Sequence, residues 1–142
     1  MPLEWAVVSE SNVDVVRTAL DAFNRGDQAA LLALFTDDAE VYSTEALPNA
    51  GRFKGREGYL EWVGAWLDAW DHFIVEPLDY EAIDDRRVVA PVRQRGRGRH
   101  SGVEIEMSVV YLFELEAGKV RRFELHVDRP SALAAAADVT ES

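Results

Sequence analysis

The stretch Arg93–Glu106, RQRGRGRHSGVEIE, decides the fold of this chain. By composition it resembles an arginine- and glycine-rich segment that binds nucleic acid. With a side-chain period of two it instead predicts a β-hairpin, in which Ser101-Gly102 is the turn and the glycine supplies the positive φ that such turns need. A long hairpin has two faces, and the composition of each face predicts where the core lies.

Two arginines of the predicted hairpin already have acidic partners. Its register sets Arg99 opposite Glu104 and Arg97 opposite Glu106. Opposite charges across neighbouring strands contribute roughly 0.2–1 kcal/mol per pair. The chain also carries a formal net charge of −11, which repels phosphate backbones and anionic membranes. These observations argue against nucleic acid and membranes as partners.

Composition predicts one globular domain at residues 11–137, between a flexible leader at 1–10 and a flexible tail at 138–142. The chain has 142 residues, of which 48% are hydrophobic, and includes four Trp, four Tyr and six Phe. Cysteine is absent, which excludes disulfides and thiolate chemistry and is compatible with the reducing cytoplasm, where we expect the protein. The start of the chain does not resemble a signal peptide, and no segment resembles a membrane span.

Hydrophobic periodicity predicts an α+β layout with three helices before a meander of strands. In the first helix Val13, Val16, Leu20 and Phe23 share one face, and in the third Tyr59, Trp62, Val63, Trp66 and Trp70 do so. The predicted helices lie at about 13–23, 28–35 and 56–70, with a last helix from 129 to 137. The predicted strands lie at about 39–44, 73–82, 87–99, 103–115 and 119–127, and 47–54 is a loop. We expect a cone-shaped, curved antiparallel sheet with the three N-terminal helices on its concave face.

Residues 103–115 indicate which face of the sheet is the core. The odd positions, from Val103 to Leu115, are all apolar or aromatic and are expected to face the helices. Val110 and Leu112 then form an apolar strip on the outer face, which favours a homodimer through that face. Arg93 and Arg95, which have no acidic partner in this register, are candidates to contact the dimer mate.

Five segments resemble one known family. They are Phe23–Asp27 (FNRGD), Ala30–Ala39 (ALLALFTDDA), Phe53–Gly58 (FKGREG), Ala117–Val120 (AGKV) and His126–Asp128 (HVD). Together they resemble SnoaL-like polyketide cyclases and ketosteroid isomerases. The resemblance implies the cone-shaped α+β fold of the nuclear-transport-factor-like superfamily. That superfamily includes isomerases, cyclases, hydrolases, dehydratases and proteins without chemistry, so the fold alone does not assign an activity.

The functional residues of ketosteroid isomerases are not matched here. By the resemblance, their base Asp falls on Ser43, their oxyanion-hole Tyr falls on Ala19, and their protonated Asp falls on Val110 or Tyr111. Ser43 cannot take an α-proton unaided, which argues against isomerisation by that mechanism. SnoaL-like cyclases place an Asp after a His at the end of the last strand. The resemblance therefore implies that Asp128, with His126, is the candidate acid/base residue of an aldol cyclisation.

Asp128 and His126 also have structural interpretations. Asp128 precedes a helix and suits its N-cap. The direction of His126 depends on the loop after the strand 103–115. A three-residue loop, 116–118, points Val127 inward and His126 outward, whereas a two-residue loop points His126 and Asp128 inward. Hydrophobicity favours the three-residue loop.

The predicted cone leaves a hollow between helices and sheet. Trp62 and Trp66 either pack in the core or wall this hollow, and Gln94 and Tyr111 are the polar groups expected to reach into it. Ser43, which is small, suits either place. The full set of candidate ligand-binding residues is Val41, Ser43, Trp62, Trp66, Gln94, Met107, Tyr111 and Val127.

Two functional hypotheses follow. In the first, the domain binds a small hydrophobic molecule of ketone-like or polyketide-like type, with or without cofactor-free acid/base chemistry of the cyclase or isomerase class. In the second, it is a non-catalytic ligand-binding or dimerisation module. No cofactor is expected because the chain has no glycine-rich loop between a strand and a helix. No metal is expected because His72, His100 and His126 lack ligand spacing.

Overall fold

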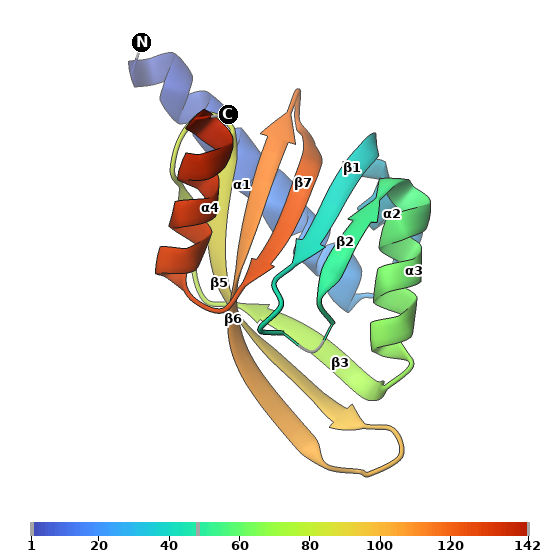
Figure 1. Cartoon of the computed structure of the whole chain (residues 1–142). Helices are drawn as coiled ribbons and strands as arrows, with labels where there is room; N and C mark the ends of the chain where they lie inside the picture. The colour runs from blue at the N-terminus through green and yellow to red at the C-terminus, as the bar shows by residue number, and fades with distance from the viewer. Residues whose placement is uncertain (1, 48, 142) are drawn as a thin grey trace.

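The protein is built on one curved sheet with helices on both faces (Figure 1). The computed structural model describes the backbone of residues 2–47 and 49–141 and the side chains of residues 10–47 and 49–137. Three residues lie outside the described ones: Met1 of the expected leader, Pro48 of the expected loop and Ser142 of the expected tail. The elements are α1 (Pro2–Asn24), α2 (Gln28–Ala33), β1 (Phe35–Ser43), β2 (Gly51–Lys54), α3 (Gly55–Leu67), β3 (Trp70–Pro77), β4 (Glu81–Ala82), β5 (Arg87–Gly98), β6 (Glu104–Glu116), β7 (Lys119–His126) and α4 (Arg129–Glu141).

The sheet confirms the α+β class but is mixed instead of antiparallel. Its order is β2-β1-β7-β6-β5-β3, with β4 paired to β5. β1 runs parallel to β7, and the other pairs are antiparallel. A hairpin turn forces its two strands to run in opposite directions, but β1 and β7 lie far apart in the chain and no such turn joins them. The expected loop at 47–54 contains β2, which pairs with β1 at the edge.

Helices α1, α2 and α3 cover the inner face, and α4 covers part of the outer one. The main core contains Val16 and Leu20 of α1, Leu31 of α2, Trp62 of α3 and the inward residues of the sheet. A second cluster joins Val89, Val110 and Leu112 to Ala132 and Ala136 of α4. The expectation of an exposed strip at Val110 and Leu112 is therefore wrong, because α4 of the same chain buries it. The homodimer loses this support and stays a prediction.

The hairpin of β5 and β6 forms with a register shifted by two residues. Arg97 lies opposite Glu104 and Arg95 opposite Glu106, instead of the pairs predicted. The connection is longer than the two residues Ser101-Gly102, because the Gly98 backbone N–H bonds the Val103 carbonyl at 2.8 Å and closes the turn there. A shift of two residues preserves the face of every side chain, so the prediction of the inward face is unaffected.

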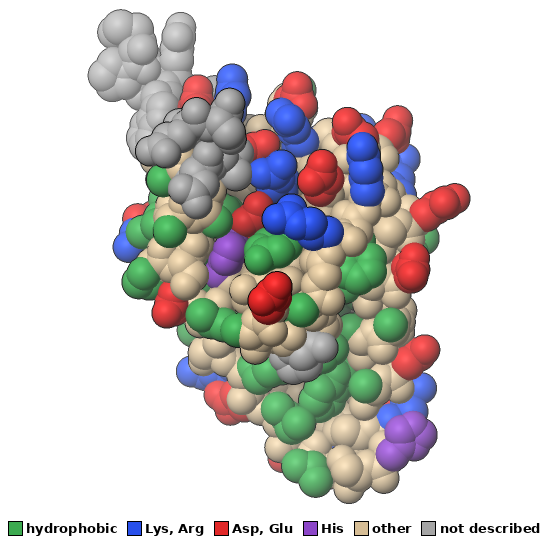
Figure 2. All heavy atoms as spheres, viewed as in Figure 1, with side chains coloured by type: hydrophobic (Ala, Val, Ile, Leu, Met, Phe, Trp, Pro, Cys, Tyr) green, Lys and Arg blue, Asp and Glu red, His purple; other side chains and the backbone are tan. Residues whose placement is uncertain are grey.

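The arginines of the hairpin are paired within the chain. Arg93 contacts Glu106 at 2.8 Å and Glu76 at 3.2 Å, and Arg95 contacts Glu76 at 3.3 Å. The expectation that Arg93 and Arg95 lack acidic partners is wrong, because Glu76 of the neighbouring strand β3 pairs with both. Elsewhere on the surface, acidic and basic side chains are interspersed over the face shown in Figure 2.

Gly96 allows aromatic rings to approach the hairpin closely. A Cβ at this position would meet ring atoms of Trp70 and Phe73 at 3.1 Å. Beyond this point the hairpin extends past the helices (Figure 1), so Val103 and Ile105 of the inward set are exposed. The prediction that all odd residues from Val103 to Leu115 face helices therefore holds only for the inner half of β6.

The connection between β6 and β7 combines the two alternatives predicted for it. The loop has two residues, Ala117 and Gly118, both at positive φ, 51° and 79°. The register then shifts by one residue between Glu114 and Leu115, leaving one extra residue on β7. A two-residue loop alone would turn His126 toward the core. The bulge turns the side chains after it to the opposite face, so Phe123 and Leu125 lie in the main core instead.

The end helices are longer than the sequence indicated. α1 begins at Pro2 instead of about residue 13, and proline is favoured in the first turn of a helix. α4 continues to Glu141, beyond the expected end at 137. No described helix is long and apolar enough to cross a membrane.

Candidate functional site

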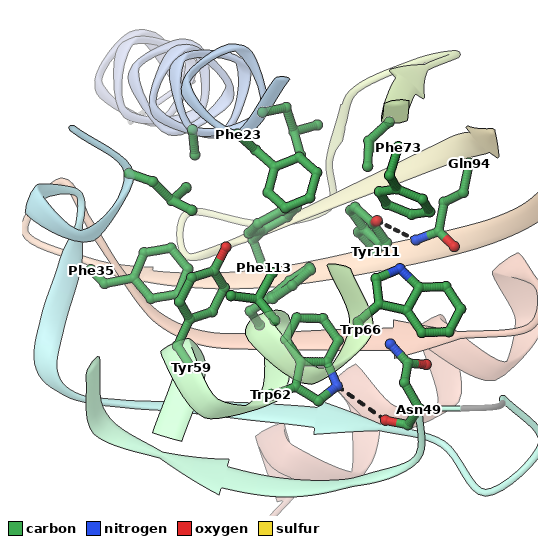
Figure 3. A pocket seen from close by; sticks show the side chains of 16 residues that line it. Phe23, Phe35, Asn49, Tyr59, Trp62, Trp66, Phe73, Gln94, Tyr111 and Phe113 are labelled. Carbon is green, nitrogen blue, oxygen red and sulfur yellow. Dashed lines mark hydrogen bonds between the residues drawn. The ribbon is translucent and has the colours of Figure 1, made fainter. Parts of the chain in front are cut away.

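A hollow lies between α1, α3 and the inner face of the sheet (Figure 3). Most of its lining is aromatic or aliphatic, and the described lining contains no charged side chain. The lining residues are Ala19, Leu20, Phe23, Leu31, Phe35, Asn49, Tyr59, Trp62, Val63, Trp66, Phe73, Val75, Gln94, Tyr111, Phe113 and Phe123. α1 and α3 contribute residues from their predicted apolar stripes, and β3, β5, β6 and β7 contribute inward-facing residues.

The hollow is narrow and adjoins a wider groove. Its volume is about 40 Å³, whereas ligand pockets usually have about 300–1,000 Å³. The groove, of about 290 Å³, lies outside and shares Asn49, Trp62 and Trp66 with the hollow. These three residues therefore separate the two spaces. Trp66 is half-buried and its ring contacts Trp70 and Phe73.

Gln94 and Tyr111 form the polar pair inside the hollow. The Gln94 side-chain amide donates a hydrogen bond to the Tyr111 hydroxyl. Since that oxygen accepts from Gln94, the proton of Tyr111 is left to bond a guest. Burial raises the pKa of Tyr111, although the bond from Gln94 opposes the shift. The hydroxyl is therefore protonated at neutral pH and acts as a donor.

Asn49 fixes Trp62 at the mouth of the hollow. The Trp62 indole N–H donates to the Asn49 backbone carbonyl at 3.0 Å. Ser43 donates to the Asn49 side-chain oxygen at 3.2 Å. The edge of Trp62 packs against Phe123 of β7 at 6.0 Å between ring centroids. Trp62 is therefore held from both sides, whereas no side-chain hydrogen bond to a described residue holds Trp66.

Half of the predicted ligand-binding residues line the hollow. The structure brings together Trp62, Trp66, Gln94 and Tyr111. Four others lie elsewhere. Val41 and Ser43 are buried behind the lining, Met107 is half-buried on the hairpin, and Val127 is 42% exposed after β7. The expectation that Val127 points inward is wrong, because β7 ends at His126.

Asp128 is the N-cap of α4 and lies outside the hollow. Its carboxylate accepts the Ser131 backbone N–H at 2.9 Å. This bond and one with the Ser131 hydroxyl hold the pKa of Asp128 below its usual value. Of the two interpretations of Asp128, the geometry therefore matches the cap.

His126 lies on the outer face of the sheet, beside α4. It is buried, and its Nε2 lies 2.8 Å from Glu124, which is buried too. The ring of Tyr42 contacts His126 at 6.0 Å between centroids. The sheet thus separates both candidate acid/base residues, Asp128 and His126, from the hollow.

Replacing Asp128 by alanine is expected to lower the melting temperature and to leave ligand binding unchanged. The pKa of the Asp128 carboxyl is lower in the folded state than in the unfolded chain. The carboxylate therefore stabilises the folded state fully at a pH above the unfolded pKa. This stabilisation is lost as the pH falls through the folded pKa. The melting-temperature difference between wild type and Asp128→Ala should shrink below about pH 4. Asp128→Asn, which keeps an acceptor oxygen, is the control. Lost ligand binding with an unchanged melting temperature would contradict the cap.

The sequence analysis missed Tyr59, Phe23 and Asn49 as lining residues. Tyr59 and Phe23 lie on the apolar stripes predicted for the third and first helices, and this signal could have identified them. Asn49 follows no periodic pattern, since it lies in the segment between β1 and β2. Among the residues that the structure describes, no three His, Asp or Glu side chains gather closely enough to hold a metal ion.

Comparison with known proteins places these features in a wider group. A family model described as SnoaL-like domain matches residues 16–123. Bal32a, from a soil-derived mobile gene cassette, is 27% identical with a TM-score of 0.77, over 89% of this chain and 95% of that one. A protein from Sinorhizobium meliloti, named "putative polyketide cyclase", is 26% identical with a TM-score of 0.66, over 80% and 94%. An NTF2-like protein from Burkholderia pseudomallei shares the fold, at 19% identity and a TM-score of 0.74, over 87% and 95%. A search of curated proteins found no match.

Proposed function

Because the chain belongs to the SnoaL-like domain family, we propose that its hollow binds a small, neutral, largely apolar molecule of ketone-like or polyketide-like type. The observation that carries the proposal is the polar pair Gln94–Tyr111 within an aromatic lining. Aromatic walls with a few placed polar groups are typical of small-molecule sites. The likeness to the Sinorhizobium meliloti protein, which is named "putative polyketide cyclase", supports the polyketide-like class.

We propose binding of the ligand without catalysis, because the described lining of the hollow offers no side chain that can act as a base. Cyclase or isomerase chemistry needs a group that takes a proton from the substrate. The described lining contains no carboxylate and no imidazole, and burial raises the pKa of both lining tyrosines, Tyr59 and Tyr111. These side chains suit hydrogen-bond donation, so the non-catalytic hypothesis is the one we adopt.

Entry of the ligand requires Trp66 to move. The hollow and the outer groove meet at Trp66, whose side chain makes ring contacts with Trp70 and Phe73 but no hydrogen bond to a described residue. We propose that Trp66 turns toward the groove and joins the two spaces. Trp62, held by Asn49, stays as a fixed wall.

Two probes of similar shape test the proposal. The ketone 2-acetylnaphthalene is neutral, whereas 2-naphthoate is anionic at pH 7. Calorimetric titration should detect binding of the ketone and little or none of the anion, because the described lining offers no cation. At a hundred times its dissociation constant the ketone should stabilise the protein by about 2.7 kcal/mol. Preferred binding of the anion, or silence across a broad panel of neutral bicyclic compounds, would overturn the proposal.

Tyr111→Phe is expected to weaken binding of 2-acetylnaphthalene by about tenfold, or about 1.4 kcal/mol. The variant removes the donor but keeps the ring. The unfolding free energy should also fall, by about 1–3 kcal/mol, because the buried Gln94 amide loses its acceptor. Calorimetry and urea unfolding measure the two losses, and Tyr42→Phe on the outer face is the control. An unchanged dissociation constant of the ketone for the folded variant would count against contact between Tyr111 and the ligand.

A further inference from the structure

The Tyr59 hydroxyl lines the hollow and has no hydrogen-bond partner among the described residues. Tyr59 is 2% exposed, and its ring packs against Phe35 and Trp62 with centroids at 5.4 and 6.1 Å. Figure 3 shows its oxygen pointing from α3 into the hollow. The ring is thus fixed on both sides, and the hydroxyl is presented to whatever fills the space.

A phenylalanine would fill the same site without a polar atom. A hydroxyl at a mostly apolar wall stabilises a complex only when it is hydrogen-bonded, so tyrosine here favours a guest that offers it a polar partner. Burial raises the pKa of Tyr59, and neighbouring Tyr111 raises it further. The group therefore keeps its proton at neutral pH and can donate a hydrogen bond to an acceptor on the guest.

Tyr59 is separate from the polar pair already described. Gln94 donates to Tyr111, and neither of them bonds Tyr59. Tyr59 lies on α3, whereas Gln94 and Tyr111 lie on neighbouring strands across the hollow (Figure 3). The lining therefore presents hydrogen-bond donors from two sides.

We infer that Tyr59 is a specificity-determining residue that donates a hydrogen bond to a carbonyl-type oxygen of the bound molecule. This inference rests on the proposed function. It narrows the ligand class to neutral carbonyl compounds over hydrocarbons of the same shape. A site with a buried donor rejects an analogue that lacks the acceptor, because the donor is then left unpaired.

The compounds 1-tetralone and tetralin differ by one carbonyl group and form a matched pair of probes. Calorimetric titration of both into wild type, Tyr59→Phe and Tyr42→Phe gives six dissociation constants. Tyr59→Phe should weaken the binding of 1-tetralone by about tenfold and leave the binding of tetralin unchanged or slightly tighter. Tyr42→Phe, on the opposite face of the sheet, should change neither.

Ligand-free unfolding separates this role from a structural one. Removal of a hydroxyl that bonds no described residue should leave the melting temperature of Tyr59→Phe unchanged or raised, whereas a structural role would lower it. A tenfold selective loss of 1-tetralone with undiminished stability supports the inference. Equal effects on both probes, or a lowered melting temperature, overturn it while the proposed function stands. If neither probe binds wild type and the panel of neutral bicyclic compounds is silent, the proposed function fails together with it.

Discussion

Replacing Arg87 by alanine is expected to reduce the unfolding free energy by about 3–5 kcal/mol. Arg87 and Glu114 have side chains that are each only 9% exposed, and they form an ion pair at 3.3 Å across β5 and β6. Arg87 also contacts Asp84 at 2.8 Å. The variant would leave the Glu114 carboxylate buried, and Arg121 at 3.8 Å would be its one remaining ionic partner among the described residues. Such a loss is a large share of the roughly 5–15 kcal/mol that stabilises a typical domain.

Urea unfolding of Arg87→Ala and Arg95→Ala measures this effect against a matched control. Arg95 lies on the same strand and contacts Glu76 at 3.3 Å, but both side chains are well exposed. An exposed pair contributes about 0–1 kcal/mol. The double variant Arg87→Met/Glu114→Leu should recover most of the loss, because no charge is then left buried without its partner. Similar small losses for Arg87→Ala and Arg95→Ala would contradict the argument.

Phe113→Ala is expected to cost about 3–5 kcal/mol and to enlarge the hollow. Phe113 is 2% exposed and stacks on Phe123, with centroids at 4.9 Å and an interplanar angle of 17°. Its ring lines the hollow, so the vacated space adds to the volume already there. Small apolar molecules should bind the variant more tightly than wild type. Tetralin at a hundred times its dissociation constant should restore about 2.7 kcal/mol.

Leu112→Ala is the control for the enlarged hollow. Leu112 precedes Phe113 but lies on the other face, in the cluster beneath α4. Its truncation should also destabilise the protein, by about 2–5 kcal/mol, without improving the binding of tetralin. Thermal unfolding with and without tetralin compares the two variants. Equal stabilisation of both by tetralin would show that the molecule does not bind in the hollow.

The inward face of the sheet could be predicted from the sequence because alternation fixes facing. Val109, Tyr111 and Phe113 lie in the main core as the pattern of 103–115 indicated. The register of the hairpin could not be obtained in the same way. Alternation repeats every two residues, so it cannot distinguish Arg97 opposite Glu104 from Arg97 opposite Glu106.

Other features depended on contacts that local patterns do not encode. The bulge near Glu114 and Leu115 sets the direction of His126, and no turn motif marks it. The cover of Val110 and Leu112 by α4 arises from a helix whose alanine-rich sequence carries little amphipathic signal. In the candidate site, Trp62, Trp66, Gln94 and Tyr111 were predicted from facing, whereas Asn49 depends on the path of an irregular segment.

Because α4 covers part of the outer face, the inner half of strand β6 separates two packed spaces, the hollow on one side and the cluster under α4 on the other. Side chains on this half of β6 alternate between the two faces of the sheet. Tyr111 faces the hollow, and Leu112 faces the space under α4. Deletion or insertion of a single residue in this half of β6 would turn the side chains beyond it to the opposite face of the sheet, and so change the lining of both spaces. A change in chain length is therefore expected to be tolerated at the hairpin tip, which extends past the helices (Figure 1).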